Sequence, residues 1–337
     1  MDISNRKRLI LTKIVALHTD SGDPIGSRLL QEYLNTMSVS TATLRNEMAQ
    51  LTAIGLLEQP HTSAGRVPTE QGYRYYLNNL MNVEPVSSGE MEAIREEVEK
   101  MDSDPDKAAE FAASSLAELS GLGAITCTPV GSETQMSYFD LMKVGRYNTA
   151  IMGITNLGSL KTRVCRTDSE LTETEVRTLR TVINNGLRFT SSEDADEERI
   201  SSMAAESGIM PSKALPIITS AAELLKGSKD VRVFRAGQGN LLKYRELSDH
   251  IDQTVRLFEQ TKGLAARLSK DGGTEIFVGS ELGEGFDSLS MVVSRYRVAG
   301  GGYGGLAVVG PVRMSYRRIV PRLSEYAKSM SEALATR

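Results

Sequence analysis

Tryptophan is absent from this chain, and cysteine and histidine are scarce. The two cysteines, Cys127 and Cys165, are isolated and form no CxxC pair, so we expect neither a disulfide framework nor a zinc site. The three histidines, His18, His61 and His250, are scattered, which favours ordinary surface or packing roles. The sequence therefore predicts no metal centre and no bound cofactor.

Long apolar runs are also missing. No run approaches the roughly 20 apolar residues that a membrane helix needs, and the first residues do not form a signal peptide. We therefore expect a cytoplasmic protein that makes no contact with a membrane. We find no nucleophile suitably spaced from a base and no suitably spaced pair of carboxylates, so we do not expect an enzyme.

An excess of positive charge, which is common in nucleic-acid-binding proteins, is lacking as well. The 337 residues carry a formal net charge of −4, and that charge is unevenly distributed. Residues 1–82 contain eight Lys and Arg and seven Asp and Glu, a net +1, so the remainder carries −5. So weakly basic a segment binds DNA weakly through charge alone, and specific contacts from a dimer would be needed. The length suggests two or three domains.

The stretch 39–68 has the pattern of a helix followed by a β-hairpin. Ser40 is a favoured N-cap, and Val39 and Leu44 have the spacing of a hydrophobic staple. Apolar residues at i, i+4 and i+7 predict one buried helix face: Leu44, Met48 and Leu51. The order of cap, staple and stripe predicts a recognition helix.

Polar side chains lie on the other side of this helix, near its N-terminus, where free N–H groups and the helix dipole favour anions. Arg and Asn are suited to bidentate contacts with guanine and adenine in the major groove. The residues expected to face the groove are Ser40, Thr41, Thr43, Arg45 and Asn46. Each of them alone would be an ordinary surface residue, and their order in this pattern supports DNA binding.

A short hairpin, or wing, is predicted after Gly55, a residue that can end a helix in a left-handed conformation. One strand begins at Leu56, the other returns through Arg66 and Val67 and is stopped by Pro68, and small residues 60–65 form the tip. An Arg on such a wing would lie along the DNA backbone or in the minor groove. The wing residues expected at DNA are His61, Thr62, Ser63 and Arg66.

Two helices are expected before the recognition helix. The first covers Ser4–His18, and its basic residues 6–8 either touch phosphate or are simply solvated. Its expected buried face is Leu9, Ile10, Ile14 and Leu17. Ser27 is expected to cap the second helix, and the short turn 35–38 then leads into the recognition helix, as in a helix-turn-helix.

The helix expected after Pro68 contains several tyrosines. A run of tyrosines can stack on bases, but the spacing of Tyr73 and Tyr76 with Leu77 and Leu80 is that of a buried helix face. We therefore expect these tyrosines to pack in the core of the N-terminal part. The following residues, 82–90, read as a linker.

The remaining pattern predicts an α+β arrangement of helices around an antiparallel sheet. Expected strands cover 124–128, 138–144, 150–155, 160–165, 275–278, 289–298 and 306–309. Expected helices cover 91–101, 107–120, 172–189, 248–270 and 317–334. The stretch from about 170 to 265 is mostly helical apart from 231–234. It separates two strand-rich halves, which suggests an insertion.

The glycine-rich segment Gly300–Gly305 could be read as a phosphate cradle. No Gly-Lys-Ser/Thr follows it, and it lies between two strands rather than before a helix. A hairpin loop is therefore the favoured interpretation.

The sequence resembles a known family, the bacterial heat-inducible transcription repressors called HrcA. The resemblance rests on three segments, of which the first two are long and gapless: PIGSRLL at Pro24–Leu30, STATLRNEMAQLTAIGLLEQPHTSAGRVPTEQGYRYYL at Ser40–Leu77, and VVGPVRMSYRRIV at Val308–Val320. The third segment includes Gly310–Met314, to which we assign a structural role as a strand-to-helix turn. The likeness spans most of the chain.

The resemblance implies an α+β fold in which a winged helix-turn-helix is followed by a GAF-like α+β domain that is interrupted by an inserted, mostly helical dimerising domain. The implied division is 1–82 for the DNA-binding domain, 83–103 for a linker and connecting helix, 104–169 and 266–337 for the GAF-like domain, and 170–265 for the insertion. It also implies that the residues named above for the helix and the wing contact DNA.

The resemblance further implies a homodimer that binds double-stranded DNA at an inverted-repeat operator and represses chaperone operons. Heat would relieve repression, and a GroEL-type chaperonin would help to keep the repressor active. Such a protein would be nucleoid-associated in the cytoplasm. An alternative from another class is a winged-helix regulator whose GAF-like domain binds a small effector. A second is an enzyme that happens to carry a winged helix.

Overall fold

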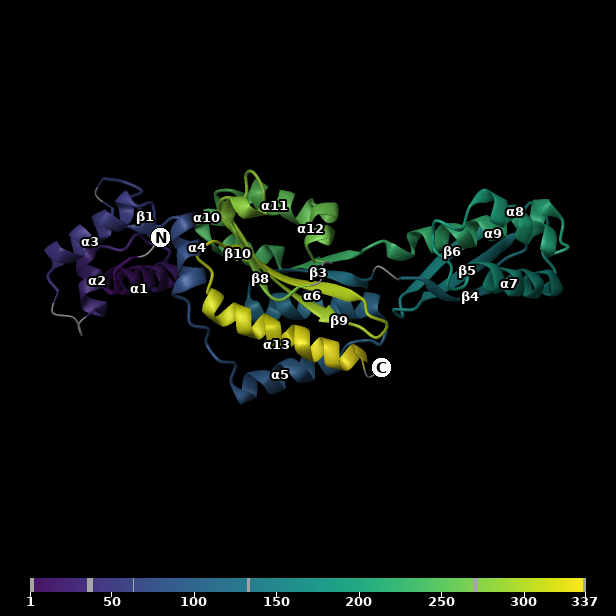
Figure 1. Cartoon of the computed structure of the whole chain (residues 1–337), viewed down its shortest axis with the longest axis horizontal. Helices are drawn as coiled ribbons and strands as arrows, with labels where there is room; N and C mark the ends of the chain where they lie inside the picture. Colours follow the sequence, from purple (N-terminus) through teal and green to yellow (C-terminus); the bar gives the residue numbers. More distant parts are fainter. Residues whose placement is uncertain (1–2, 35–38, 63, 132–133, 269–271, 336–337) are drawn as a thin grey trace.

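The computed structural model describes residues 3–34, 39–62, 64–131, 134–268 and 272–335. Three units lie in a row (Figure 1): helices with a small hairpin at one end, a five-stranded sheet in the middle, and a three-stranded sheet with its own helices at the other end. The strand pairs of the described residues are antiparallel. The chain is thus a mixed α and β protein built from helices and antiparallel sheets.

The N-terminal unit (residues 3–80) comprises α1 (Asn5–Ser21), α2 (Ser27–Tyr33), α3 (Thr41–Ala53), β1 (Leu57–Glu58), β2 (Val67–Pro68) and α4 (Glu70–Asn79). Hydroxyl side chains begin three of these helices. Ser4, Ser40 and Thr69 each accept a hydrogen bond from the backbone N–H three residues on. Gly55 has φ +80°, so it ends the α3 segment in the expected left-handed conformation. The expected hairpin is present as β1 and β2.

Tyr73 and Tyr76 are 2% and 3% exposed, which confirms that they belong to the core. Two details of this unit differ from expectation. Gly26, not Ser27, is the N-cap of α2, and Ser27 is buried in its first turn. In α1, Ile10 and Ile14 are buried as expected, together with Leu11 and Val15, whereas Leu9 is 37% exposed and Leu17 is only partly buried.

The central unit is a five-stranded sheet with the order β7-β3-β10-β9-β8. Its strands are β3 (Gly123–Val130), β7 (Val233–Ala236), β8 (Glu275–Val278), β9 (Leu289–Arg297) and β10 (Tyr303–Pro311). Its helices are α5 (Ser88–Glu99), α6 (Pro105–Ser120), α10 (Arg245–Ser248), α11 (Ile251–Glu259), α12 (Thr261–Leu268) and α13 (Tyr316–Ala335), with short 3-10 turns at Gly227–Lys229, Gln238–Lys243 and Gly279–Leu282.

Figure 1 shows α6, α13 and α5 on one side of this sheet and α11 and α12 on the other. Because both faces are covered, β3, β9 and β10 are buried along nearly their whole length. The glycine-rich segment joins β9 to β10, and Tyr303 pairs with Arg297, which confirms the hairpin interpretation.

The expectation of a single helix over 248–270 is wrong for the described residues, which end at 268 here. Two helices, α11 and α12, meet at Gln260, whose φ and ψ of −72° and 70° are not helical. A break of one residue leaves the apolar spacing on either side almost unchanged, so the pattern did not indicate it.

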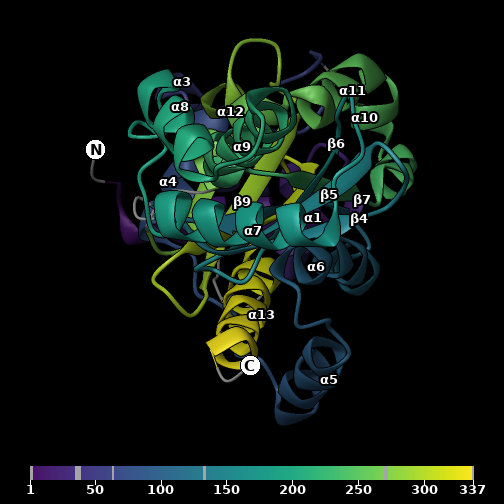
Figure 2. The ribbon, with the colours of Figure 1, turned by 90° about the vertical axis from the view of Figure 1, so that its right-hand side faces the viewer.

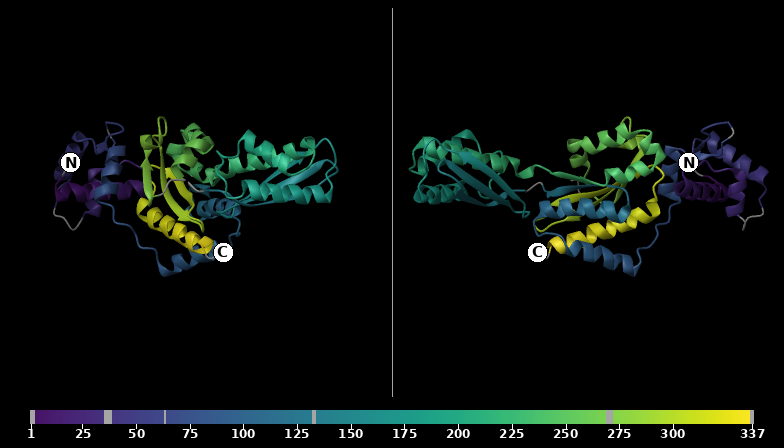
Figure 3. Two further views of the ribbon diagram at one scale, coloured as in Figure 1. Left: turned by 45° about the vertical axis from the view of Figure 1, so that its right-hand side comes forward. Right: turned by 180° about the vertical axis from the view of Figure 1, so that it is seen from behind.

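The distal unit (residues 134–226) has a sheet of order β4-β5-β6 and a hydrophobic core of its own. Its elements are β4 (Met136–Lys143), β5 (Asn148–Thr155), β6 (Leu160–Arg166), α7 (Glu173–Leu187), α8 (Glu197–Glu206) and α9 (Pro211–Lys226). Figure 2 looks along the long axis with this unit in front, and Figure 3 shows it from two further sides.

The three strands of the distal unit group differently from the expected division of the chain, which placed them with the C-terminal strands, in segments 104–169 and 266–337, and began the insertion at residue 170. In the structure Phe139, Ile151 and Cys165 pack with α7 and α9, whereas α11 packs in the core of the central unit. Strand patterns specify a strand but not the layer against which it packs.

Candidate nucleic-acid interface

The N-terminal end of α3 carries the polar residues that were expected to face DNA. The Ser40 Oγ accepts from the Thr43 backbone N at 3.1 Å and lies 3.0 Å from the Thr43 Oγ1. Thr41 is the first residue of the helix and is half-buried. These hydroxyls therefore shape the helix end, and the free N–H groups of the first turn lie beside them.

Arg45 and Asn46 are both exposed on α3. The Arg45 Nε donates to the Ser27 Oγ at 3.2 Å, so α2 supports the guanidinium from behind. This bond uses Nε, whereas a bidentate contact with a base uses the terminal Nη groups. Ser27 thus pre-orients Arg45, a role that sequence reasoning missed because it assigned Ser27 to a helix cap.

Two alanines, Ala42 and Ala49, share the exposed surface of α3 with these two residues and Gln50. Leu44, Met48 and Leu51 are buried as expected. Alanines at exposed positions allow a helix backbone to approach a groove closely. The surface of α3 that faces away from the core therefore combines small and polar side chains.

The hairpin tip is held by hydrogen bonds that the sequence did not indicate. The Gln59 side-chain amide donates to the carbonyl oxygens of Thr62, at 2.9 Å, and of Ala64, at 3.0 Å. The Ala64 backbone N donates to the His61 carbonyl at 2.8 Å. His61 and Thr62 are exposed, and Ser63 lies outside the described residues.

Arg66 connects the hairpin to the rest of the N-terminal unit. Its Nε donates to the Thr52 Oγ1 on α3 at 3.1 Å, and its backbone pairs with Ile25 through two bonds of 2.9 Å. The expected role of Arg66 at DNA is therefore accompanied by a structural one. The pairing fixes the hairpin beside the loop between α1 and α2.

The basic first turn of α1 faces α3. The Arg6 Nη1 lies 3.3 Å from the Glu47 Oε1, and the Lys7 Nζ lies 4.0 Å from the Glu47 Oε2. Ion pairs at the surface that are held at 3.3 Å or more contribute little to stability. Glu47 partly neutralises these two cations, whereas Arg45 and Arg66 at α3 donate to the neutral hydroxyls of Ser27 and Thr52.

The N-terminal unit docks on the central unit through polar contacts. The Ser280 Oγ donates to the Glu70 Oε1 at 2.6 Å, and the Arg74 guanidinium binds Glu281 and the Ile276 carbonyl. The Arg313 Nη1 donates to the Thr19 carbonyl at 3.0 Å. The orientation of α3 is therefore tied to the sheet of the central unit.

His18 lies at this contact, 2.8 Å from the Tyr73 hydroxyl through its Nδ1. Burial and the positive charge of Arg313 lower the pKa of His18 to about 4. His18 is consequently neutral at pH 7 and serves as a packing residue, in agreement with expectation.

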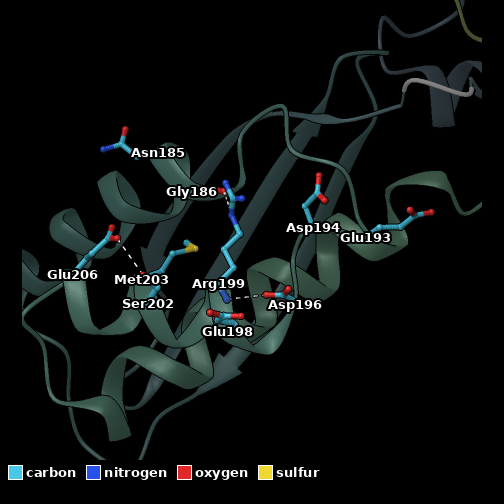
Figure 4. A pocket seen from close by; sticks show the side chains of 10 residues that line it. All are labelled: Asn185, Gly186, Glu193, Asp194, Asp196, Glu198, Arg199, Ser202, Met203 and Glu206. Carbon is cyan, nitrogen blue, oxygen red and sulfur yellow. Dashed lines mark hydrogen bonds between the residues drawn. The ribbon is translucent and has the colours of Figure 1, made fainter.

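A hollow of about 620 Å³ in the surface of the distal unit is lined by the C-terminal end of α7, the loop that follows it and α8. Figure 4 shows Glu193, Asp194, Asp196 and Glu198 around Arg199. The Arg199 Nε donates to the Gly186 carbonyl at 2.9 Å. An acidic surface repels phosphate, so the distal unit offers no competing DNA site here.

A second hollow, of about 520 Å³, lies between α5, α6 and α13, next to the N-terminal unit. Apolar residues such as Ile94 and Leu122 line it together with Arg313 and Arg318. Among the described residues no group of three or more His, Cys, Asp and Glu side chains could hold a metal ion. None of the described helices has both the length and the apolarity that a bilayer crossing needs.

Comparison with known proteins identifies the relatives of the chain. The model of the HrcA protein C-terminal domain matches residues 106–320. The heat-inducible transcription repressor HrcA of Pelotomaculum thermopropionicum is 30% identical over 344 residues, which cover 99% of this chain and 97% of the relative. The repressor of that name from Geobacter sulfurreducens is 29% identical, with 99% and 98% covered.

A solved structure of a hypothetical protein, at 2.2 Å resolution, is similar with a TM-score of 0.64, a sequence identity of 22%, and 99% of both chains covered. This likeness shows a shared fold. The match of the family model covers more than half of the chain, and the relatives are similar along nearly its full length. The chain therefore belongs to the HrcA family.

Proposed function

We propose that this chain is a sequence-specific transcriptional repressor of heat-shock chaperone operons, which binds an inverted-repeat operator as a homodimer. The observation that carries the proposal is the exposed N-terminal half of α3, where Ser27 supports Arg45 and the β1–β2 hairpin lies alongside. The name of its relatives, heat-inducible transcription repressor, supports the biological role.

In this proposal the N-terminal unit is a winged helix-turn-helix, with α3 in the major groove and the hairpin as the wing along the backbone or in the minor groove. Contacts would come from Ser40, Thr41, Thr43, Arg45, Asn46, His61, Thr62, Ser63 and Arg66. The central unit corresponds to the GAF-like domain and the distal unit to the insertion. The packing supports revised boundaries for that insertion, at about 134 and 226.

Dimerisation is proposed through the open face of the distal sheet. Side chains that alternate with the buried ones form cross-strand rows on this face: Tyr138 pairs with Ile154, which pairs with Leu160, and Ala150 pairs with both Met142 and Val164. Met142 and Val164 are 52% and 64% exposed. A sheet face with so many exposed apolar side chains is typical of a protein–protein interface.

Dimerisation would also compensate for the weak positive charge of the N-terminal unit. One N-terminal unit, with a net charge near +1, has little non-specific attraction for DNA. Two linked copies bind two half-sites, and the second contact gains from effective concentration. We propose that heat abolishes this binding and that a GroEL-type chaperonin restores it. We expect the protein to act in the cytoplasm, at the nucleoid.

The proposal is tested by anisotropy titration of the full chain on an inverted-repeat duplex from a chaperone promoter. The control is a duplex of the same composition with one half-site scrambled. We expect tight binding to the intact repeat and a large loss on the control, because only one of the two N-terminal units then has a matching half-site. Equal binding to both duplexes would contradict the proposal.

The 520 Å³ hollow supports a second candidate, a regulator that binds a small effector. Its volume lies in the range of small-molecule sites, and its lining includes Arg313, which also holds the Thr19 carbonyl of the N-terminal unit. An effector there would act on the orientation of α3. A ligand that changes operator affinity in the wild type but not in Leu122→Trp, which fills the hollow, would favour this candidate.

A further inference from the structure

The glycine-rich hairpin between β9 and β10 has no part in the proposed DNA contacts, yet it touches the distal unit. Leu157, on the turn between β5 and β6, is 5% exposed and packs in the core of the central unit rather than in that of its own sheet. A Cβ atom at Gly302 would lie 2.6 Å from the Leu157 Cδ1, and one at Gly300 would lie 2.8 Å from the Asn156 carbonyl oxygen. The glycines therefore form a seat for this turn.

A buried carboxylate holds the other end of the same turn. Asp106, at the start of α6, is 5% exposed and accepts from the Ser159 Oγ at 3.2 Å. Its Oδ2 lies 3.1 Å from the Arg232 Nη1 and 4.0 Å from the Lys161 Nζ. Ser159 and Lys161 belong to the distal unit, while Arg232 lies on the segment that returns from it. Asp106 thus joins three separate segments.

Two covalent connections alone would leave the distal unit free to swing. The chain leaves the sheet after β3 and returns before β7, and these neighbours are bonded side by side through Thr128 and Arg232, at 3.0 Å in both directions. Two adjacent strands act as a hinge. The seated turn contacts the β9–β10 hairpin, and β10 lies on the opposite side of β3 from β7, so it adds a third point of attachment.

We propose that the seated turn, residues 155–159, locks the angle between the distal and central units and thereby determines which half-site spacing the dimer recognises. This inference rests on the proposed function. If two copies join through their distal units, the angle at this joint sets the distance between the two α3 helices. A rigid joint restricts that distance, and a loose joint permits a range of distances at lower effective concentration.

The test compares Leu157→Ala and Gly302→Ala with the wild type. Leu157→Ala removes the side chain that fills the seat. Gly302→Ala pushes it out, and the displaced atom is the far end of a flexible side chain, so the fold is retained. The matched controls are Leu242→Ala, a half-exposed leucine, and Gly239→Ala, where a Cβ meets nothing within 4 Å. Leu157→Met keeps an apolar side chain and should preserve binding.

Each variant is titrated on duplexes that carry the same two half-sites separated by spacers that differ by single base pairs. The wild type and controls should show a sharp optimum. The two joint variants should remain dimeric by sedimentation but lose about tenfold in affinity at that optimum, with a flatter dependence on spacing. A purely structural defect would lower affinity equally at all spacings. If the variants had the same dependence of affinity on spacing as the wild type, the proposed role of the turn 155–159 would be wrong.

A second measurement does not depend on DNA. Spin labels on cysteines introduced at the exposed Ser114 of α6 and Ser201 of α8 report the distance between the two units, after dilution with unlabelled protein. Native Cys127 and Cys165 are buried and should not react. Leu157→Ala should broaden the distance distribution, and an unchanged distribution would overturn the lock. If the wild type fails to distinguish an inverted repeat from a scrambled duplex, the proposed function fails, and these distances still decide on the joint.

Discussion

Replacing Arg45 by alanine tests the proposed recognition helix most sharply. A bidentate contact between Arg and guanine contributes about 1–3 kcal/mol, and a symmetric dimer makes the contact twice, so operator binding should weaken by about 2–6 kcal/mol. At about 1.4 kcal/mol for each factor of ten, the dissociation constant should rise at least roughly thirty-fold. Stability should change little, because Arg45 is exposed.

The assay is anisotropy titration on the operator and on a duplex of the same composition with both half-sites scrambled, at several salt concentrations. Arg245→Ala is the matched control, since its side chain is 93% exposed and lies in the central unit. Ser27→Ala keeps the charge but removes the bond that orients Arg45 at 3.2 Å, and should lose affinity for the operator alone. An equal loss on both duplexes, with a shallower salt dependence, would refute base recognition and mark Arg45 as a phosphate contact.

Three further substitutions probe the rest of the account. Arg66→Ala breaks the 3.1 Å bond to Thr52 and should lower the free energy of unfolding by about 1 kcal/mol, measured by thermal denaturation; an unchanged midpoint would contradict the anchoring role. Val164→Asp buries a charge in the proposed interface and should give a monomer by sedimentation, whereas a persistent dimer would exclude this face. Because the folded state lowers the pKa of His18 to about 4, the unfolded chain binds this proton at a higher pH than the folded protein does. The contribution of His18 to the free energy of unfolding should therefore be complete above about pH 6.5 and fall between pH 6.5 and 4. His18→Gln should flatten that fall in chemical denaturation, and an unaltered slope would contradict the assignment to His18.

Short-range patterns in the sequence were enough to predict most of the N-terminal unit. A hydroxyl cap at Ser40, a glycine at position 55 and the spacing of Tyr73 and Tyr76 each depend on residues a few positions apart, and the structure has them as expected. The bond between Ser27 and Arg45 joins two helices, and no periodicity within either helix could indicate it.

The packing of the distal unit could not be predicted from such short-range patterns. The strands expected at 138–144, 150–155 and 160–165 lie nearly where the structure has them. Which helices they pack against was not predicted. Cys165 and Ile151 face α7 and α9, which follow them in the chain, and this choice depends on tertiary packing. The seat of Leu157 on Gly302 joins residues far apart in sequence, so the glycine-rich segment could be recognised only as a hairpin.

The central claim is that two linked copies of this chain recognise an inverted repeat. The most direct measurement is a titration of the purified protein on a chaperone-promoter repeat and on its scrambled counterpart, with and without chaperonin, at two temperatures. The account predicts specific binding that heat abolishes and chaperonin restores. Binding without preference between the duplexes would contradict the account.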